Sequence, residues 1–448
     1  MSTVYIVHAI DAEGPLVEDL GATFERLNYI FDVSIEESPE NLISLQNGNI
    51  DLGDKTRPIQ SLLAAQNLSY LGDWRSIDAM LDKILTHEYR NILPDSDGAS
   101  WIYNWFCLDH VGFEDNPRLR DLGHHKVFDH YRSLLTHEKN QRDAVYFHYH
   151  PLPYNKKAHS CATFYLNSNH LFEIIARKII ERQWFPTVFR AGFHTLRPDS
   201  HWFLEQWMPY DFSNQATGAV VDHPDLADGR LGDWRRAPSN WLGYHPSHND
   251  YQSSGQCRRW LFRCLNMQGR LRVITQNDVD QAFMEAHEHG SSILAFTNHD
   301  FRHLAPDIAR LRNMIKIASQ KWTQVRFKYS TAKHAARSHT KFSNTGPLGL
   351  NIAVAHKSSS LARLTAKTVQ GIFGPQPFLA IRDKQGNYYF DNFDFDISPH
   401  SWHYSLDWQT FSLDSLDCIA VAAPTEGADA EIGIYDVGTG QTSYYVVS

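Results

Sequence analysis

Apolar and polar positions along the first 340 residues fall into two kinds of segment. Short apolar or aromatic runs, typical of buried strands, occur at residues 4–10, 101–108, 144–149, 187–189 and 292–297. Stripes with the helical period of about 3.6 residues lie at residues 76–89, 171–183, 278–289 and 306–319. Strands that alternate with helices indicate a largely parallel sheet, either open or closed into a barrel. We therefore expect an α/β domain.

The pattern changes near residue 340, where turn residues at 343–347 interrupt the chain. Short strands separated by turn residues follow at residues 352–355, 378–382, 388–392, 418–423, 431–435 and 443–447. Such spacing is typical of a β-sandwich. We place one domain at residues 1–342 and an all-β, sandwich-like domain at residues 343–448. The sequence leaves three roles open for the second domain: packing against the first, oligomerisation and glycan binding.

Composition agrees with a globular chain of two domains. The 448 residues exceed the size at which one hydrophobic core usually stops growing, and 42% of them are hydrophobic. With a formal net charge of −9, the chain lacks the overall positive charge that favours binding to a phosphate backbone. We therefore expect no nucleic-acid partner.

Cysteine usage and hydropathy bear on the compartment. The five cysteines are scattered and form no C-x-x-C pair, which argues against a disulfide framework and a zinc–thiolate site. No run of roughly 18 apolar residues occurs, and the N-terminus lacks the basic and apolar regions of a signal peptide. We expect a cytoplasmic protein with no membrane span.

Ionisable residues gather where the predicted strands end. The first strand runs into Asp11 and Glu13, the second into Asp109-His110 and the third into His148 and His150. In parallel sheets and barrels, active sites lie at the carboxyl ends of the strands. The same edge of the sheet should therefore hold these side chains.

The H-x-H formed by His148 and His150 is the most specific local signal. Alternate residues of an extended segment point the same way, so two imidazoles can reach one ion. Of Asp11 and Glu13, one can bind the metal while the other takes a proton. Two imidazoles and a carboxylate leave positions for water and a substrate oxygen, as hydrolytic metal sites require.

Two later strand ends add further candidates. His299 is a candidate general acid whose tautomer Asp300 or another carboxylate would fix, and a structural histidine is the alternative. Arg190 is expected either to orient a carboxylate or stabilise an oxyanion, or to form an ordinary buried salt bridge.

Other polar and aromatic clusters have a structural interpretation that we favour. Asp109-His110 with His124-His125, and the loop from His245 to His248, are candidates for pocket lining or a second metal site, but loop hydrogen bonding is the better interpretation of each. Four tryptophans are candidates for stacking on sugar rings, although core packing is the better interpretation for most of them: Trp202, Trp207, Trp234 and Trp241.

The order of these motifs resembles the polysaccharide deacetylase superfamily, the NodB-homology fold of carbohydrate esterase family 4, over roughly residues 3–330. Residues 10–14 look like its first acidic motif, 189–193 like its arginine motif and 298–300 like its final histidine motif. His148-Tyr149-His150 takes the place of its metal-binding histidine motif, whose usual spacing is wider. Residues 109–131, 197–214 and 299–304 are most similar to WbmS-like proteins of bacterial surface-polysaccharide clusters.

The resemblance implies a (β/α) barrel, distorted or incomplete, that removes an acyl group from an N-acylated sugar during O-antigen or capsule synthesis. By analogy Asp11 is the base, His299 the acid, Arg190 orients the base, and Glu13 binds the metal with the two histidines. The inserted Ala12 leaves open an exchange of roles between the two acids. Zinc is the first expectation for the ion, and nickel, cobalt or iron would also suit such ligands.

Two rival functions remain open. A metal-free glycosidase would pair Glu13 with Asp211 or Asp300 at a separation of about 5–10 Å. A non-catalytic glycan-binding or scaffold protein would keep the fold without turnover. The remaining candidates for weak substrate contacts are Asp109, His110, His125, Asp211, His245 and Asp300.

Overall fold

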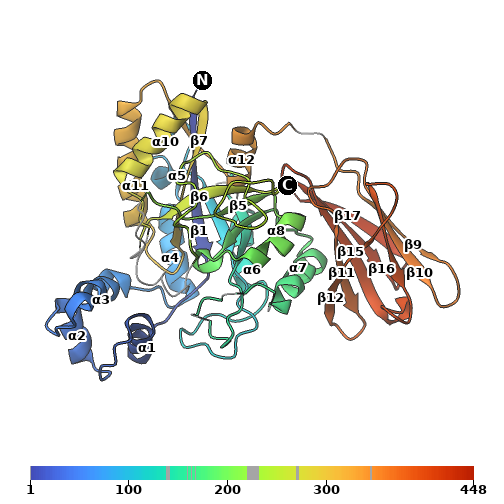
Figure 1. The fold of residues 1–448 in the computed structure, drawn as a ribbon, viewed down its shortest axis with the longest axis horizontal. Coiled ribbons are helices and arrows are strands. Elements are labelled where there is room, and N and C mark those ends of the chain that lie inside the picture. Colours follow the sequence, from blue (N-terminus) through green and yellow to red (C-terminus); the bar gives the residue numbers. More distant parts are fainter. Residues whose placement is uncertain are drawn as a thin grey trace.

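The computed structural model describes residues 2–137, 142–158, 160–162, 164–166, 168–218, 232–268, 272–343 and 346–447. Seven parallel strands close into a barrel in the order β1 to β7, with β7 returning to β1 (Figure 1). The seven strands are β1 (Thr3–Ala12), β2 (Tyr103–Cys107), β3 (Ala144–Tyr149), β4 (Val188–Ala191), β5 (Tyr210–Asn214), β6 (Trp260–Asn266) and β7 (Ser291–His299). The short β8 (Arg326–Tyr329) pairs with the first half of β1. The second half of the same edge of β1 pairs with β2. The predicted parallel sheet is therefore a closed barrel.

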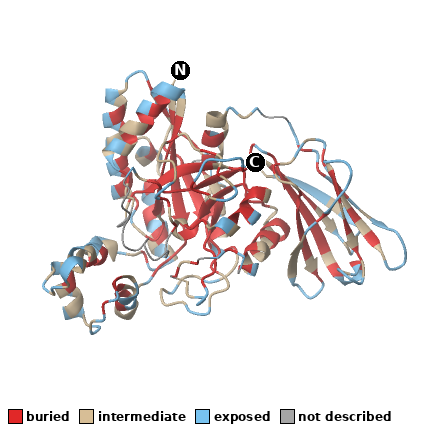
Figure 2. Ribbon diagram, viewed as in Figure 1, coloured by how far each residue is buried: buried red, intermediate tan, exposed pale blue. Residues whose placement is uncertain are grey.

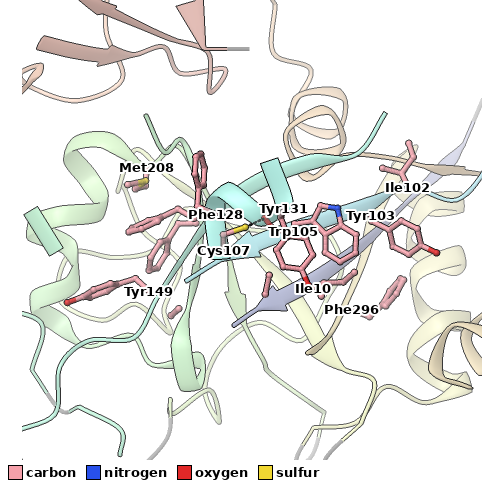
Figure 3. Close-up of a cluster of buried hydrophobic side chains, with 14 of the residues drawn as sticks. Ile10, Ile102, Tyr103, Trp105, Cys107, Phe128, Tyr131, Tyr149, Met208 and Phe296 are labelled. Atoms are coloured by element: carbon pink, nitrogen blue, oxygen red, sulfur yellow. Dashed lines mark hydrogen bonds between the residues drawn. The ribbon is translucent and has the colours of Figure 1, made fainter. Parts of the chain in front are cut away.

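Helices surround the barrel, as the predicted alternation requires (Figure 1). Those that follow the barrel strands are α4 (Trp74–Ile84), α5 (His87–Arg90), α6 (Lys126–Leu134), α7 (Asn169–Arg182), α8 (His201–Trp207), α10 (Gln276–His289), α11 (Ala305–Lys321) and α12 (Ala332–Thr340). Figure 2 shows the barrel strands as buried along most of their length, with exposed residues on the outer faces of the helices. The layer between strands and helices is aromatic: the rings of Trp105 and Tyr131 stack with centroids 4.6 Å apart (Figure 3).

The interior of the barrel changes from apolar to polar along the strands. Side chains from all seven strands meet in one buried cluster with three alanines of α12, among them Val7, Tyr146 and Ile293. Because successive side chains of a strand alternate between its two faces, the same inward rows continue toward the carboxyl ends. There they reach Asp11 in β1 and His148 in β3. The alternation of inward and outward side chains along the strands thus places ionisable groups at one end of a barrel whose interior is otherwise apolar.

A helical extension follows the carboxyl end of β1. It consists of α1 (Leu20–Phe31), α2 (Pro39–Asn47) and α3 (Thr56–Leu63), which project beside the barrel (Figure 1). These helices bury a small hydrophobic cluster of their own, including Phe24, Leu45 and Leu62. The extension therefore has a separate core and begins only a few residues after Glu13.

Two antiparallel sheets form the C-terminal part. One has the order β13-β14-β10-β9 and the other β12-β11-β15-β16-β17. Their strands are β9 (Asn351–His356), β10 (Ala362–Lys367), β11 (Phe378–Asp383), β12 (Tyr388–Asp391), β13 (Asp394–Phe395), β14 (Ser401–Leu406), β15 (Leu416–Pro424), β16 (Ala430–Asp436) and β17 (Gln441–Val447). Both sheets contribute to one buried cluster, for example Leu364 and Ile419. Residues 344 and 345 of the predicted turn lie outside the described residues.

The C-terminal sheets pack on the barrel through α7 and α8. Phe172 of α7 stacks on Phe390 of β12 with ring centroids 4.6 Å apart. The indole Nε1 of Trp207 in α8 donates to the carbonyl oxygen of Gln376 at 3.2 Å. Of the three roles that the sequence leaves open for this part, packing against the barrel is confirmed.

Two barrel strands and the edge strand β8 lacked a clear signal in the sequence. β5, β6 and β8 each carry charged or amide side chains within the strand, such as Asp211, Arg263 and Lys328, so no continuous apolar run marks them. The single helix expected at 76–89 is two helices, α4 and α5. Thr86 divides them because its hydroxyl accepts a hydrogen bond from Tyr89 N and caps the second helix.

Several expectations about single residue types are confirmed. Trp207, Trp234 and Trp241 are buried core residues, whereas Trp202 is 70% exposed. All five cysteines are free. Among the described residues, no helix has the length and apolarity needed to cross a membrane.

His8 in β1 provides a pH-dependent contribution to stability. Its Nε2 lies 3.0 Å from Asn298 Oδ1, and Trp101 Nε1 donates to its Nδ1 at 3.1 Å, so the ring is neutral. Burial lowers the pKa of His8 from 6.5 to about 3. The unfolded chain therefore binds a proton at a higher pH than the folded chain, and the stability present above pH 6.5 is lost as the pH falls toward 3.

We expect His8→Gln to flatten the dependence of the unfolding free energy on pH. The lost slope is at most about 1.4 kcal/mol per pH unit, the value for one proton. Chemical unfolding between about pH 5 and about pH 7.5 measures it. His287→Gln, at an exposed position of α10, is the control and should keep the parental slope. Equal slopes for His8→Gln and the parent would contradict the prediction.

Candidate metal centre

Glu13, His148 and His150 meet at the carboxyl end of the barrel. β1 ends at Ala12 and β3 at Tyr149, so Glu13 and His150 each extend an inward row by one position beyond the strand. His150 Nε2 lies 3.1 Å from His148 Nε2 and 3.3 Å from Glu13 Oε1, and His148 Nε2 lies 3.7 Å from the same oxygen. Three donor atoms therefore face one point.

This arrangement fits a divalent metal ion. Ligands at about 2.0–2.1 Å from a tetrahedral zinc are about 3.3 Å apart, close to the observed separations. His148 Nδ1 donates to the carbonyl oxygen of Arg190 at 2.9 Å, which leaves the Nε2 lone pair free to bind an ion. The pKa of Glu13 is well below its usual value: burial raises it, but Arg120 and the two histidines outweigh burial. The carboxylate is therefore ionised, as a metal ligand must be.

Asp11 lies beside this group but outside it. Arg190 Nε donates to Asp11 Oδ1 at 2.6 Å, and His148 Nδ1 is 3.8 Å from the same oxygen. Burial raises the pKa of Asp11, but the charge of Arg190 and of the nearby histidines lowers it further, so the carboxyl is ionised at neutral pH. Asp11 can therefore act as a base near the metal group.

Arg190 acts through Asp11. Its side chain is fully buried, with Nη1 donating to the carbonyl oxygen of Phe212 at 2.7 Å and Nη2 donating to His194 Nδ1 at 2.9 Å. No part of the guanidinium is exposed to a substrate. Of the roles considered for Arg190, the geometry matches orientation of a carboxylate by a buried ion pair.

His299 lies on the open side of the site. Its Nε2 is 3.9 Å from Asp11 Oδ2 and 3.8 Å from Glu13 Oε1, and 32% of its side-chain surface is exposed. Burial of the ring by the surrounding protein lowers the pKa of His299 to about 4, although the Glu13 and Asp11 carboxylates raise it. The ring is therefore neutral at pH 7 and can meet a substrate from solvent.

The backbone around Glu13 is held by side chains from distant segments. Asp300 accepts hydrogen bonds from Glu13 N and Gly14 N, both at 2.9 Å, and from the Tyr131 hydroxyl at 2.8 Å. His110 Nε2 donates to the Glu13 carbonyl oxygen at 2.7 Å. Burial lowers the pKa of His110 to about 3 and raises that of Asp300 to about 7. These two predicted candidates therefore hold the backbone at Glu13. Asp300 does not fix the His299 tautomer, because its oxygens accept from the Glu13 and Gly14 amides and from the Tyr131 hydroxyl.

Asp300→Asn should weaken metal binding by about 10–100-fold, the usual effect of losing a group that orients a ligand. The new amide NH₂ would face a backbone N–H in either orientation, so the Glu13–Gly14 backbone would lose one of its two bonds to this side chain. Competition with a chromophoric chelator measures the affinity. Tyr131→Phe is the control: it removes only one donor to Asp300 and should cost about 1 kcal/mol of stability with a smaller change in affinity. Parental affinity in Asp300→Asn would contradict this role.

The other predicted candidates lie outside the metal group. Asp109 forms a buried ion pair with Lys178 at 2.6 Å and accepts from the backbone N of His125 at 2.5 Å. His125 Nε2 donates to Glu181 Oε2 at 2.7 Å. His245 Nδ1 donates to the carbonyl oxygen of Arg259 at 3.0 Å. Loop and helix hydrogen bonding, the structural interpretation, describes what these residues do.

A second buried group, His201, Glu205 and Cys257, could also hold a metal ion by the spacing of its donors. Arg259 Nη1 lies between two of them, 2.8 Å from His201 Nδ1 and 2.5 Å from Glu205 Oε1. Asp211 is buried nearby, 3.5 Å from Arg259 Nε. Because a guanidinium already contacts two of these donors, Glu13, His148 and His150 form the better candidate for a metal site.

Two residues of the site, Arg120 and His194, carried no recognisable sequence signal, and Gly192 lay in the predicted arginine motif without a role of its own. Arg120 Nη2 donates to Glu13 Oε2 at 2.6 Å from a loop with no strand or helix pattern. His194 contacts Arg190, and Gly192 lets the His150 ring pack against the backbone, since a Cβ at that position would lie 1.8 Å from His150 Cδ2. The arginine motif at residues 189–193 contains Gly192 and ends one residue before His194, but it indicated no role for either residue.

Comparison with known proteins provides no identity for the chain. No protein-family model matches it, and no curated protein matches it. Function is therefore inferred from the chemistry of the site.

Proposed function

We propose that this protein is a metal-dependent hydrolase that removes the acyl group from an N-acylated sugar or sugar conjugate. The single observation that carries the proposal is the meeting of Glu13, His148 and His150 at the carboxyl end of the barrel, with Asp11 and His299 beside them. Zinc is the expected ion, and nickel, cobalt or iron would also suit two imidazoles and a carboxylate. A divalent cation held there would polarise the scissile carbonyl and make water more acidic.

The side chains then have separate tasks. Asp11, ionised and oriented by Arg190, takes a proton from the attacking water. His299 starts neutral, so it must gain a proton before it can protonate the leaving amine. Asp11 Oδ2 and His299 Nε2 are 3.9 Å apart, which allows the proton to pass between them through one water or a small ring movement.

The resemblance to polysaccharide deacetylases supports the choice of substrate class. A seven-stranded barrel agrees with the distorted or incomplete barrel that the resemblance implies. The acidic, histidine, arginine and final histidine motifs lie on β1, β3, β4 and β7, and all of them face the same end. We therefore infer an N-acylated sugar of a bacterial surface polysaccharide as the substrate.

The two-carboxylate glycosidase is less well supported. Its second carboxylate would be Asp211 or Asp300, and both side chains are fully buried. Asp300 is engaged by the Glu13–Gly14 backbone and Asp211 faces Arg259. Neither can reach a glycosidic oxygen in this arrangement.

Release of acetate from N-acetylated sugars tests the proposal. The metal-reconstituted protein should release acetate from a chito-oligosaccharide or from a nucleotide-linked N-acetylhexosamine, without new reducing ends. Asp11→Asn should lower the rate by about 10²–10⁴-fold, the scale of general base catalysis. Asp211→Asn is the matched control for loss of a buried carboxylate. New reducing ends would favour the glycosidase, and an inert, metal-loaded protein would favour the glycan-binding alternative.

A further inference from the structure

A second cavity, of about 590 Å³, lies between the barrel and the C-terminal sheets. Its walls come from α8, from the loops before β6 and from the segment around β11 and β12. None of its lining residues belongs to the metal centre. Its lining includes Trp202, His201, Glu205, Arg258, Gln376 and Asn392.

The contact that forms this cavity is tight. Gln376 Nε2 donates to Gln206 Oε1 at 2.9 Å and to Asn392 Oδ1 at 2.6 Å. A Cβ on Gly374 would lie 1.8 Å from the carbonyl oxygen of Gln206, so the two backbones touch there. The cavity therefore has defined walls.

One wall of the cavity offers an aromatic platform. Trp202 is 70% exposed, although the other tryptophans considered for sugar stacking are buried. A large exposed indole beside planar polar side chains is the usual composition of a saccharide site, because sugar rings present an apolar C–H face rimmed by hydroxyls. The Asn392 amide uses its oxygen for Gln376, and its NH₂ group donates to no other described residue.

Among the side chains that line the cavity, the charge that no ion pair neutralises is positive. Glu205 is neutralised by Arg259 Nη1 at 2.5 Å and also accepts from Arg258 N at 2.5 Å. The exposed Arg258 guanidinium forms no ion pair with any described residue. His201, whose ring is part of the wall, is neutral because burial lowers its pKa to about 3. An acidic group on the ligand would therefore find one free cation at the rim.

His201 also leaves one hydrogen bond unmade. Its Nδ1 accepts from Arg259 Nη1, while its buried Nε2 has no partner within the described part of the chain. A buried polar atom without a partner is costly, and such atoms in native proteins often mark a place that a ligand or water fills. This observation is independent of the exposed tryptophan.

We propose that this cavity binds a saccharide unit that carries a carboxylate. Trp202 stacks on the ring, Asn392 donates to a hydroxyl and Arg258 pairs with the carboxylate. The identification of this unit as part of the polymer on which the metal centre acts rests on the proposed function. The C-terminal sheets thereby complete a sugar site that the barrel alone lacks.

Fluorine NMR of the full chain labelled with 5-fluorotryptophan tests the inference. Trp202→Phe assigns the Trp202 resonance, and Trp408, 82% exposed and outside the cavity, is the internal control. The probes are trigalacturonate, a glucuronic acid disaccharide and N-acetylneuraminic acid, with neutral chitotriose for comparison. We expect a saturable shift of the Trp202 resonance by at least one acidic probe below about 10 mM, with the Trp408 resonance unmoved.

Arg258→Gln should weaken that binding about tenfold and remove the preference over chitotriose. Absence of a saturable Trp202 shift with all three acidic probes overturns the proposal. Equal binding of chitotriose, or parental affinity in Arg258→Gln, overturns it as well.

The same titration separates this inference from the proposed function. In a His148→Ala, His150→Ala variant the Trp202 shift should persist, because no cavity residue is a metal ligand. Failure of acetate release with a persistent shift refutes the hydrolase and leaves the saccharide site. Acetate release without a Trp202 shift refutes the saccharide site alone.

Discussion

Replacing His148 and His150 together by alanine should abolish metal binding and hydrolysis. The parent should hold about one divalent ion per chain after reconstitution, and the variant less than about 0.1, because one carboxylate remains of three ligands. Hydrolysis should fall by more than about 100-fold, the upper end of what is lost when only an orienting group is removed. Elemental analysis and the acetate assay measure the two effects.

The chain contains a matched control for this variant. His287 and His289 have the same spacing, but they lie at the exposed end of α10. On a helix, two residues of that spacing point about 200° apart, so they do not face one ion. His287→Ala, His289→Ala should keep the parental metal content. A parent that takes up no zinc, nickel, cobalt or iron on reconstitution would contradict the metal centre.

Gly192→Ala should disrupt the same centre without changing any ligand. The added Cβ would lie 1.8 Å from Cδ2 and 2.5 Å from Nε2 of His150, so the imidazole must leave its position. We expect metal affinity to fall by about 100-fold or more, and overpacking to cost about 1–3 kcal/mol of stability. Chelator competition and the midpoint of thermal unfolding report the two changes separately.

Gly371→Ala is the control for the glycine prediction. The nearest atom to a Cβ at Gly371, His400 Cε1, is 3.8 Å away, an ordinary contact. It should leave both affinity and midpoint unchanged. If Gly192→Ala binds metal as tightly as the parent, the His150 ring is not held where the structure places it.

The sequence was informative where a strand buried on both faces is also mostly apolar, as in β1 and β7, but not in β5 and β6, which carry buried charged side chains. Residues 4–10 and 292–297 are mostly apolar runs, and they are the central parts of β1 and β7. β8 alternates Arg326 and Lys328 with aromatic residues, because it pairs with only part of β1 and lies outside the ring. Its half-exposed pattern is that of an edge strand, which an apolar-run criterion misses.

Local motifs predicted the metal group but not its supports. Glu13, His148 and His150 follow from spacings of two residues on extended chain, a geometry that sequence alone carries. Asp300 reaches the Glu13 amide across 287 positions, and Arg120 reaches its carboxylate across 107. Such pairings depend on barrel closure, so the sequence marked Asp300 as a candidate but not its bond to the Glu13 amide, and it gave no local sign of Arg120.

The pairing of the first barrel strand with the last one, β7, means that β1 is synthesised long before its partner. Thr3 of β1 pairs with Ser291 of β7, and both acids of the site sit at the end of that first strand. At roughly 5–20 residues per second, a ribosome needs about 15–60 s to deliver the partner. For that interval β1 has an apolar edge without its neighbour, which is the condition under which nascent chains aggregate. Expression at a low temperature with abundant holding chaperones should therefore raise the yield of folded protein.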